Sequence, residues 1–447
     1  MSEVSPQIDQ LISNVQARRE GATDQARRGR EVKKTNIPEP DIMTDRRFTR
    51  ENESVPRSPT TRLIRGSLAA TLKDIKNDPQ MRIDILPGFV RESRELAENL
   101  DKLDTQFHTT GKFFEAGKGD KRKDSIYAVT LDLREPSNEP DTRIPWVMIG
   151  GAYSTSEQNA ALSMALALQG EKVIVLTHPE QMRDQEGFRG PKDLLRNTAR
   201  ENIKMFTSAI SNLGLSHVNL LGDSLGGAFA LAVAADSELT KKVQIENAVI
   251  LQPVGFEDRS QKELMSHGNE DERRNVEDPE AKVIMALQGN TDAYRKSGAQ
   301  LHDVSMRKRL WESRKFISSS QATAGQINDS EVIVKAINNM SGDLEIWGCG
   351  DDQLARPQAI NAAVDKARLT LVEENQKRLY SYEVEGAHHN NLILNAFGFI
   401  RARSQEQEAR HDIGENYSGI KKMNIATMER SGAEYILKKM QQKARAK

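Results

Sequence analysis

Cysteine is nearly absent from this sequence, which contains one, Cys349, among 447 residues. A single thiol excludes a disulfide within the chain and indicates a reducing compartment. The first twenty residues lack the apolar core of a secretory signal, and no run approaches the roughly 20 apolar residues that cross a bilayer. The sequence therefore predicts a cytoplasmic protein with no integral membrane segment.

An excess of charge of one sign is also lacking, because 64 Lys and Arg residues nearly balance 65 Asp and Glu residues. This balance argues against binding to nucleic acid through the field of the whole chain. The sequence contains no HExxH, no CxxC, no GxxxxGK[ST] and no GxGxxG after a strand. Metal, dinucleotide and P-loop sites therefore have no support, and we expect no cofactor and no metal.

The composition and the spacing of apolar residues change along the chain, and these changes predict its domain organisation. Residues 1–60 are charged, with few aromatics, and are expected to be a disordered extension. Residues 61–122 space their apolar residues three and four apart, which is typical of helices. Residues 123–404 form the main domain, in which residues 255–341 are charged and helical and are expected to be an inserted cap. Residues 405–447 end in a basic amphipathic helix.

Short β-branched runs alternate with helical patterns in the main domain. The predicted strands cover residues 125–133, 146–151, 172–178, 217–222, 246–253, 343–350 and 378–386. Several of these runs are apolar almost throughout, which indicates strands that are buried on both faces, as in a parallel sheet. Strand and helix alternating at this spacing predict the α/β class, with a doubly wound, mostly parallel sheet.

One glycine-flanked serine, Ser224, follows a buried strand in the stretch VNLLGDSLGGAFALAVAA. It forms G-x-S-x-G at a strand-to-helix turn, where small residues allow strand and helix to pass closely. The start of the following helix presents free N–H groups where an oxyanion would form. Ser224 is therefore a candidate nucleophile, and the peptide N–H of Leu225 is a candidate oxyanion donor.

Two polar pairs follow later strands, first an acidic pair and then a histidine pair, which is the chain order that this strand–turn–helix architecture requires after a nucleophilic serine. Asp351 and Asp352 end the run EIWGCGDD, and His388 and His389 end the run EVEGAHH. Both pairs stand at the carboxyl ends of predicted strands, where open parallel sheets place their sites. Each pair leaves two candidates for one role.

Residues 124–403 resemble the α/β-hydrolase superfamily through GDSLGG, IWGCGDDQLARP and EGAHHN. The spacing of the resemblance favours Asp352 through Leu354 and Pro357, while Gly348 favours Asp351; we prefer Asp352. For the base it favours His389 over His388.

The resemblance also implies a second oxyanion donor after the WVMIGG strand. It assigns this role to the N–H of Ala152, with Gly151 and Tyr153 at the substrate pocket. The family often has His-Gly in this loop, and here the histidine is absent.

The letters GDSL are also the signature of a different esterase class, in which the motif opens the domain and Asp-x-x-His closes it. Here at least three predicted strands precede the motif, and none of the eight histidines has an aspartate three residues before it. The second class is therefore rejected.

The expected activity is cleavage of a carboxylic ester or thioester by a Ser-Asp-His triad, with a small-molecule acyl ester as substrate. One alternative is a non-catalytic protein of the same fold that binds a protein partner through its cap and charged termini. Another keeps the triad for acyl transfer or for lactone or peptide hydrolysis.

Overall fold

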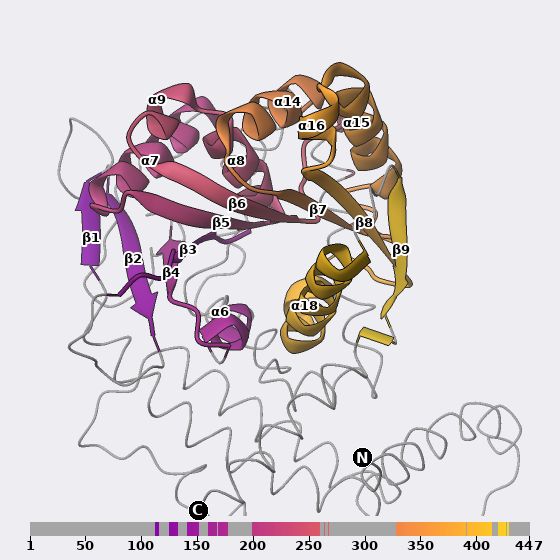
Figure 1. The fold of residues 1–447 in the computed structure, drawn as a ribbon, viewed down its shortest axis with the longest axis horizontal. Coiled ribbons are helices and arrows are strands. Elements are labelled where there is room, and N and C mark those ends of the chain that lie inside the picture. The colour runs from indigo at the N-terminus through magenta and orange to yellow at the C-terminus, as the bar shows by residue number, and fades with distance from the viewer. Residues whose placement is uncertain are drawn as a thin grey trace, which may run out of the picture.

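The computed structural model describes the central part of the chain, and Figure 1 shows its arrangement. The described residues are 112–115, 125–132, 141–151, 160–167, 169–177, 199–259, 263, 267, 328–389, 391–413, 419–425 and 427–428. Residues 1–60, most of 61–122, most of the expected cap and the end of the tail lie outside them, so those expectations stay predictions.

One sheet of nine strands runs through the described part, in the order β1-β2-β4-β3-β5-β6-β7-β8-β9. Its strands are β1 (Lys112–Glu115), β2 (Ser125–Leu131), β3 (Trp146–Ile149), β4 (Val173–Thr177), β5 (His217–Asp223), β6 (Gln244–Leu251), β7 (Leu344–Cys349), β8 (Leu379–Glu385) and β9 (Ile420–Asn424). The pairs β1–β2 and β2–β4 are antiparallel, and every other pair is parallel.

Helices cover both faces of the sheet (Figure 1). The described helices are α6 (Ala160–Ala167), α7 (Ala199–Asn212), α8 (Leu225–Ala234), α9 (Ser237–Thr240), α14 (Ser330–Asn339), α15 (Pro357–Thr370), α16 (Glu373–Gln376), α17 (Asn391–Leu394) and α18 (Ala396–Ile413). α7, α8, α9, α14, α15 and α16 lie on one face, whereas α6 and α18 lie on the other. None of the helices in these ranges is long and apolar enough to span a membrane.

The predicted fold class is confirmed, because each of the seven predicted strands is present within a mostly parallel sheet with helices on both faces. Three elements differ from expectation. β1 lies in a segment predicted to be helical, and β9 lies in the predicted helical tail. α14 lies in the predicted cap interval but packs against α8 and α15 over the sheet. Both extra strands are short, and β9 is rich in lysine, so neither resembles a buried strand.

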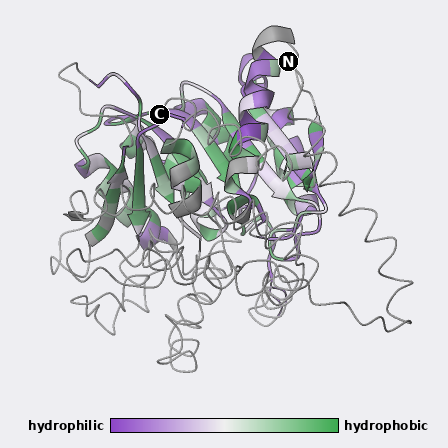
Figure 2. Cartoon of the chain, turned by 90° about the horizontal axis from the view of Figure 1, so that it is seen from below, coloured by the Kyte–Doolittle hydropathy of each residue, from purple (hydrophilic) through white to green (hydrophobic). Residues whose placement is uncertain are grey.

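Hydrophobic residues concentrate along the strands (Figure 2). The central helix α8 has the sequence LGGAFALAVA, and all of its residues are buried between the sheet, α7 and α14. A helix that is apolar all round is stable only when it is buried. Packing against the sheet therefore fixes the position of α8, which begins directly after Ser224.

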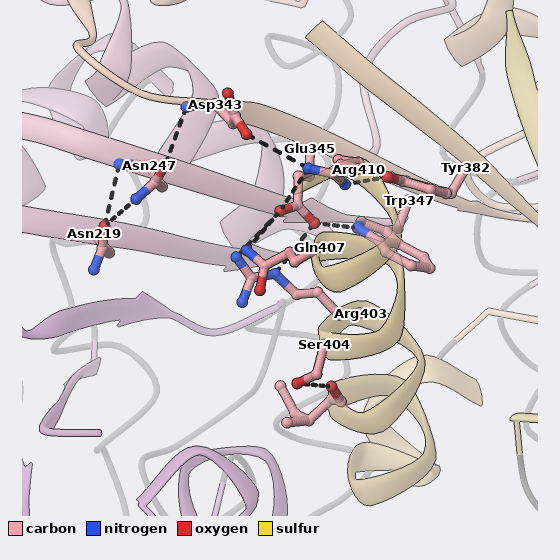
Figure 3. Close-up of polar contacts among 11 residues, drawn as sticks. Asn219, Asn247, Asp343, Glu345, Trp347, Tyr382, Arg403, Ser404, Gln407 and Arg410 are labelled. Atoms are coloured by element: carbon pink, nitrogen blue, oxygen red, sulfur yellow. Dashed lines mark hydrogen bonds and ion pairs between the residues drawn. The ribbon is translucent and has the colours of Figure 1, made fainter. Parts of the chain in front are cut away.

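A buried carboxylate holds α18 against the sheet. Glu345 of β7 has a relative exposure of 1%. Arg403 of α18 donates to both of its oxygens, from Nε and from Nη2, each at 3.1 Å. The indole Nε1 of Trp347 donates to it at 3.1 Å, and Arg410 Nη1 lies 3.5 Å away. Figure 3 shows these side chains converging from β7 and α18, a paired arrangement that an ionised group needs in the interior.

Replacement of this carboxylate, Glu345→Gln, is expected to lower the free energy of unfolding by about 3 kcal/mol, because the buried guanidinium of Arg403 would lose the carboxylate that pairs with it. Denaturant unfolding of the full chain measures the loss. The matched control is Glu373→Gln, where the side chain is 84% exposed and pairs with Lys377, the C-cap residue of α16. The control should change stability by less than about 0.5 kcal/mol, and equal losses in both variants would contradict the interpretation of Glu345.

Candidate active site

The turn at Ser224 joins β5 to α8 in an unusual backbone conformation. Ser224 has φ 52° and ψ −118°, and within the described residues only Gln252 shares a positive φ among the non-glycine residues. Such a backbone costs of order 1–3 kcal/mol and persists only where its surroundings fix it. Here Ser224 N donates to Leu251 O at 2.9 Å, and Ala228 N donates to Ser224 O at 3.1 Å.

Two glycines in the motif are required by close packing. A Cβ atom on Gly222 would lie 2.5 Å from the Cβ of Ala230, and one on Gly226 would lie 2.2 Å from Ile149 O. Any side chain would therefore push α8 away from β5 or from the end of β3. Gly222 and Gly226 are therefore required for the tight turn at Ser224.

Three side chains meet at the carboxyl end of the sheet. Ser224 Oγ lies 2.8 Å from His389 Nε2, and His389 Nδ1 lies 2.7 Å from Asp352 Oδ2. All three residues are buried, and Asp352 has a relative exposure of 1%. These are hydrogen-bond distances between a hydroxyl, an imidazole and a carboxylate in series, which is the geometry of a nucleophile with a base and an orienting acid.

The loop after β7 fixes the carboxylate of Asp352. Asp352 Oδ1 accepts from Leu354 N at 2.7 Å and from Ala355 N at 2.8 Å, which leaves Oδ2 for the histidine. His389 follows β8 through a turn at Gly386, which has φ 77°. Because β7 and β8 are parallel neighbours, their carboxyl ends bring the acid and the histidine together.

The other member of each pair lies elsewhere. The side chain of Asp351 is exposed, and its N–H donates to Ala387 O at 2.9 Å. The ring of His388 contacts the carbonyl oxygen of Asp351, with Nδ1 at 3.3 Å. The hydrogen bond to Ser224 is made by His389, so the structure brings together the preferred member of each pair.

The region of the expected oxyanion donors is described in part. Leu225 is the first residue of α8 and is buried, so its N–H lies beside the serine. Ala152 and Tyr153 lie outside the described residues. Gly151 is buried, and a Cβ there would lie 2.7 Å from Asp223 Oδ2 and 3.2 Å from Ser224 Cβ, which places this residue directly against the nucleophile turn.

A polar chain beneath the serine was not anticipated from the sequence, where Asp223 reads as a filler in the motif. Asp223 Oδ1 accepts from Gln252 Nε2 at 2.9 Å, and Gln252 Oε1 accepts from Cys349 Sγ at 3.0 Å. These residues stand at the ends of β5, β6 and β7. In the sequence these three residues only mark the ends of apolar runs, and nothing in the sequence pairs their side chains.

Burial raises the pKa of Asp223 from 3.8 to about 7. The positive charge of His389 and the hydrogen bond from Gln252 oppose this rise, and the charge of Asp352 adds to it. Within the described residues, no group of three or more His, Cys, Asp or Glu side chains is placed to hold a metal ion. What the arrangement offers chemically is an oxygen nucleophile next to a base, beside a carboxyl group that titrates near neutrality.

The titration of Asp223 predicts a pH-dependent stability. Between pH values of about 4 and 7 the folded protein retains a proton that the unfolded chain releases, so this group makes stability fall as the pH rises through that window. In Asp223→Asn the carboxamide does not titrate in this pH range. From pH 5 to 8 the variant should therefore gain stability relative to wild type, by at most about 1.4 kcal/mol for each pH unit.

Denaturant unfolding at pH 5 and pH 8 measures this gain, with Asp351→Asn as the control because Asp351 is exposed. A difference between Asp223→Asn and wild type that is the same at both pH values would contradict the raised pKa.

Comparison with known proteins places these features beside solved structures. No family model matches the chain, and no curated protein matches it. A serine hydrolase from the polyaromatic-hydrocarbon-degrading bacterium Cycloclasticus zankles is similar at 12% identity and a TM-score of 0.45, over 68% of this chain and 99% of its own. A meta-cleavage product hydrolase from Pseudomonas fluorescens is similar at 15% identity and a TM-score of 0.44, over 67% of this chain and 98% of its own. Naproxen esterase from Bacillus subtilis is similar at 11% identity and a TM-score of 0.41, over 72% of this chain and 97% of its own.

These scores are all low, so the fold is assigned from the chain's own architecture. The sheet is mostly parallel with helices on both faces, and Ser224 lies at the turn between β5 and α8. Asp352 and then His389 follow it along the chain and meet it at the carboxyl end of the sheet, the chain order that the α/β-hydrolase fold has. The described part of the chain therefore has the architecture of the α/β-hydrolase fold.

Proposed function

We propose that this protein is a serine hydrolase that cleaves a carboxylic ester or thioester through an acyl-enzyme. The observation that carries the proposal is the buried series Ser224 Oγ, His389 and Asp352, joined at 2.8 Å and 2.7 Å. A serine with an aligned imidazole and a carboxylate behind it is an activated nucleophile.

In the first half of the reaction, Ser224 Oγ attacks the acyl carbonyl and His389 Nε2 takes the hydroxyl proton. The tetrahedral intermediate collapses by breaking the bond to the alcohol or thiol, which leaves with the proton that His389 returns. In the second half, water gives its proton to His389 and attacks the acyl-enzyme. Collapse then releases the acid and restores the hydroxyl of Ser224.

Two groups support this chemistry electrostatically. The carboxylate of Asp352 holds the proton of His389 on Nδ1 and stabilises the imidazolium that forms. The N–H of Leu225, at the start of α8, and the N–H of Ala152 are the proposed donors to the oxyanion. Gly151 and Tyr153 are the proposed wall of the acyl pocket.

The first alternative is a non-catalytic protein of this fold that binds a partner through its cap and charged termini. The aligned series argues against it. Asp352 Oδ1 accepts from the main chain while Oδ2 contacts His389, an arrangement that a site without catalytic activity would not require. Acyl transfer and lactone or peptide hydrolysis share the same acyl-enzyme, and differ in the group that accepts or carries the acyl unit.

Labelling with a fluorophosphonate probe tests the nucleophile. Ser224 Oγ should attack phosphorus and displace fluoride, giving a stable adduct on the wild-type chain. Ser224→Ala should abolish the adduct, and His389→Ala should slow its formation at least about 10³-fold because the base is lost. The adduct is measured by intact mass and by the time course of labelling.

The control is His388→Ala, which removes the neighbouring imidazole and should label at nearly the wild-type rate. A folded wild-type chain that remains unlabelled would favour the partner-binding alternative. Such a protein should hydrolyse neither short-chain nor long-chain esters.

Asparagine substitutions test the acid. In Asp352→Asn the amide oxygen should keep the two N–H groups of the loop, so the amide nitrogen faces His389 Nδ1 and drives the ring proton to Nε2. His389 then cannot accept the proton of Ser224, and turnover should fall by about 10⁴-fold.

Asp351→Asn makes the same chemical change one residue away on an exposed side chain. Ester hydrolysis by this variant should remain within about threefold of wild type. A larger loss in Asp351→Asn than in Asp352→Asn would reassign the acid.

A further inference from the structure

A small pocket lies between the loop that follows β6 and the start of α15. Its walls include Val254, Phe256, Ala355 and Ile360, with Arg259 and Arg356 at its polar side. The same two loops support the candidate active site, because Val254 N donates to Ser224 O at 3.4 Å and Ala355 N donates to Asp352. The pocket is therefore adjacent to the nucleophile turn and the acid loop.

Arg259 is an unusual residue in this pocket because its guanidinium is buried and only partly used. Its side chain has a relative exposure of 4%. Nη1 donates to Gln353 O, whereas Nε and Nη2 have no hydrogen-bond partner within the described part of the chain. Nε–H and one Nη2–H lie parallel on the same edge of the group, which is the edge that binds a carboxylate through two hydrogen bonds.

The neighbouring charges leave the pocket positive. Glu257 Oε1 lies 3.8 Å from Arg259 Nη1 and 3.5 Å from Arg356 Nε. One carboxylate therefore faces two guanidinium groups. The pair with Arg259 is made on the Nη1 side and leaves the Nε–Nη2 edge open.

The start of α15 adds to this preference for an anion. Arg356 is the N-cap of this 14-residue helix, and its side chain makes no capping hydrogen bond. Residues Ala359 and Ile360 of the first helical turns line the pocket. The partial positive charge of an uncapped helix start favours a negative group at this place.

We propose that this pocket is a binding site for a carboxylate group, held by the Nε–Nη2 edge of Arg259 beside the start of α15. A buried guanidinium with an unused fork needs a planar anion with two acceptor oxygens, and a carboxylate meets that need in a small space. The carboxylate is either the charged end of the substrate itself or a separate small acid.

The position of Arg259 gives the bound group an effect on the reaction. Gln353, whose carbonyl oxygen accepts from Arg259, directly follows Asp352 in the chain. A carboxylate that orders Arg259 therefore also orders the loop that holds the acid. This effect on turnover rests on the proposed function, whereas binding of a carboxylate does not.

Thermal unfolding of the full chain with succinate measures binding without any reaction. Succinate should raise the midpoint of wild type and of Ser224→Ala above that in sodium chloride of equal ionic strength, by mass action on the folded state. Arg259→Gln should weaken the apparent affinity at least tenfold. Glu257→Gln removes the competing negative charge and should strengthen it severalfold, which a mere folding defect would not do.

Two further variants isolate the fork. Arg259→Lys keeps the charge but has no paired N–H edge, so it should lose most of the affinity. Lys335→Gln removes one positive charge from an exposed position on α14 and should bind succinate like wild type. Equal midpoint shifts in wild type and Arg259→Gln, or a shift with inorganic phosphate and none with succinate, would overturn the proposal.

Hydrolysis of two matched esters identifies the source of the carboxylate. Monomethyl succinate and methyl butyrate differ mainly in a carboxylate that replaces a methyl group. A KM for monomethyl succinate that rises at least tenfold in Arg259→Gln, with no such rise for methyl butyrate, supports the substrate as the source. Equal KM changes together with succinate binding support a separate acid. Succinate binding with no hydrolysis of either ester supports the site and counts against the proposed function alone.

Discussion

The close approach of α8 to the end of β5 is the constraint on which the candidate site depends. Gly222 and Gly226 leave no room for a side chain between this helix, β5 and β3. That contact forces the chain through the strained turn at Ser224 and directs its hydroxyl to His389 at 2.8 Å. The fully buried α8 cannot move outward to relieve the strain, because the sheet, α7 and α14 surround it. The packing of α8 against the sheet therefore fixes the position of Ser224 Oγ.

Three buried carboxyl groups have three different sets of hydrogen-bond partners. Asp352 is stabilised by two main-chain N–H groups and a histidine. Glu345 is stabilised by the guanidinium of Arg403 and the indole of Trp347. Asp223 Oδ1 accepts a hydrogen bond from the neutral amide of Gln252. Burial raises the pKa of Asp223, because water no longer stabilises its ionised form.

The strands and the order of serine, acid and histidine were readable from the sequence because each depends on a local pattern. Apolar runs such as VIVL and AVIL mark buried strands, and the glycines around Ser224 mark the turn. The choice between Asp351 and Asp352 was harder, because adjacent residues differ only in the direction that the loop gives their side chains. Long-range pairs were not predictable. Nothing local joins Glu345 to Arg403, 58 positions apart, or Arg259 to the carbonyl of Gln353, 94 positions apart.

The pair of arginines on α18 also restricts how that helix docks. Arg403 and Arg410 are seven residues, or about two turns, apart and both reach Glu345. A slide of α18 by one turn would carry Gln407 to the place of Arg403 and leave the buried carboxylate with a neutral amide. An apolar helix face tolerates such slippage because one methyl group resembles the next, whereas a single buried charge does not. The ion pairs of Glu345 therefore fix the position of α18 along its own axis, where hydrophobic contacts alone would allow several positions.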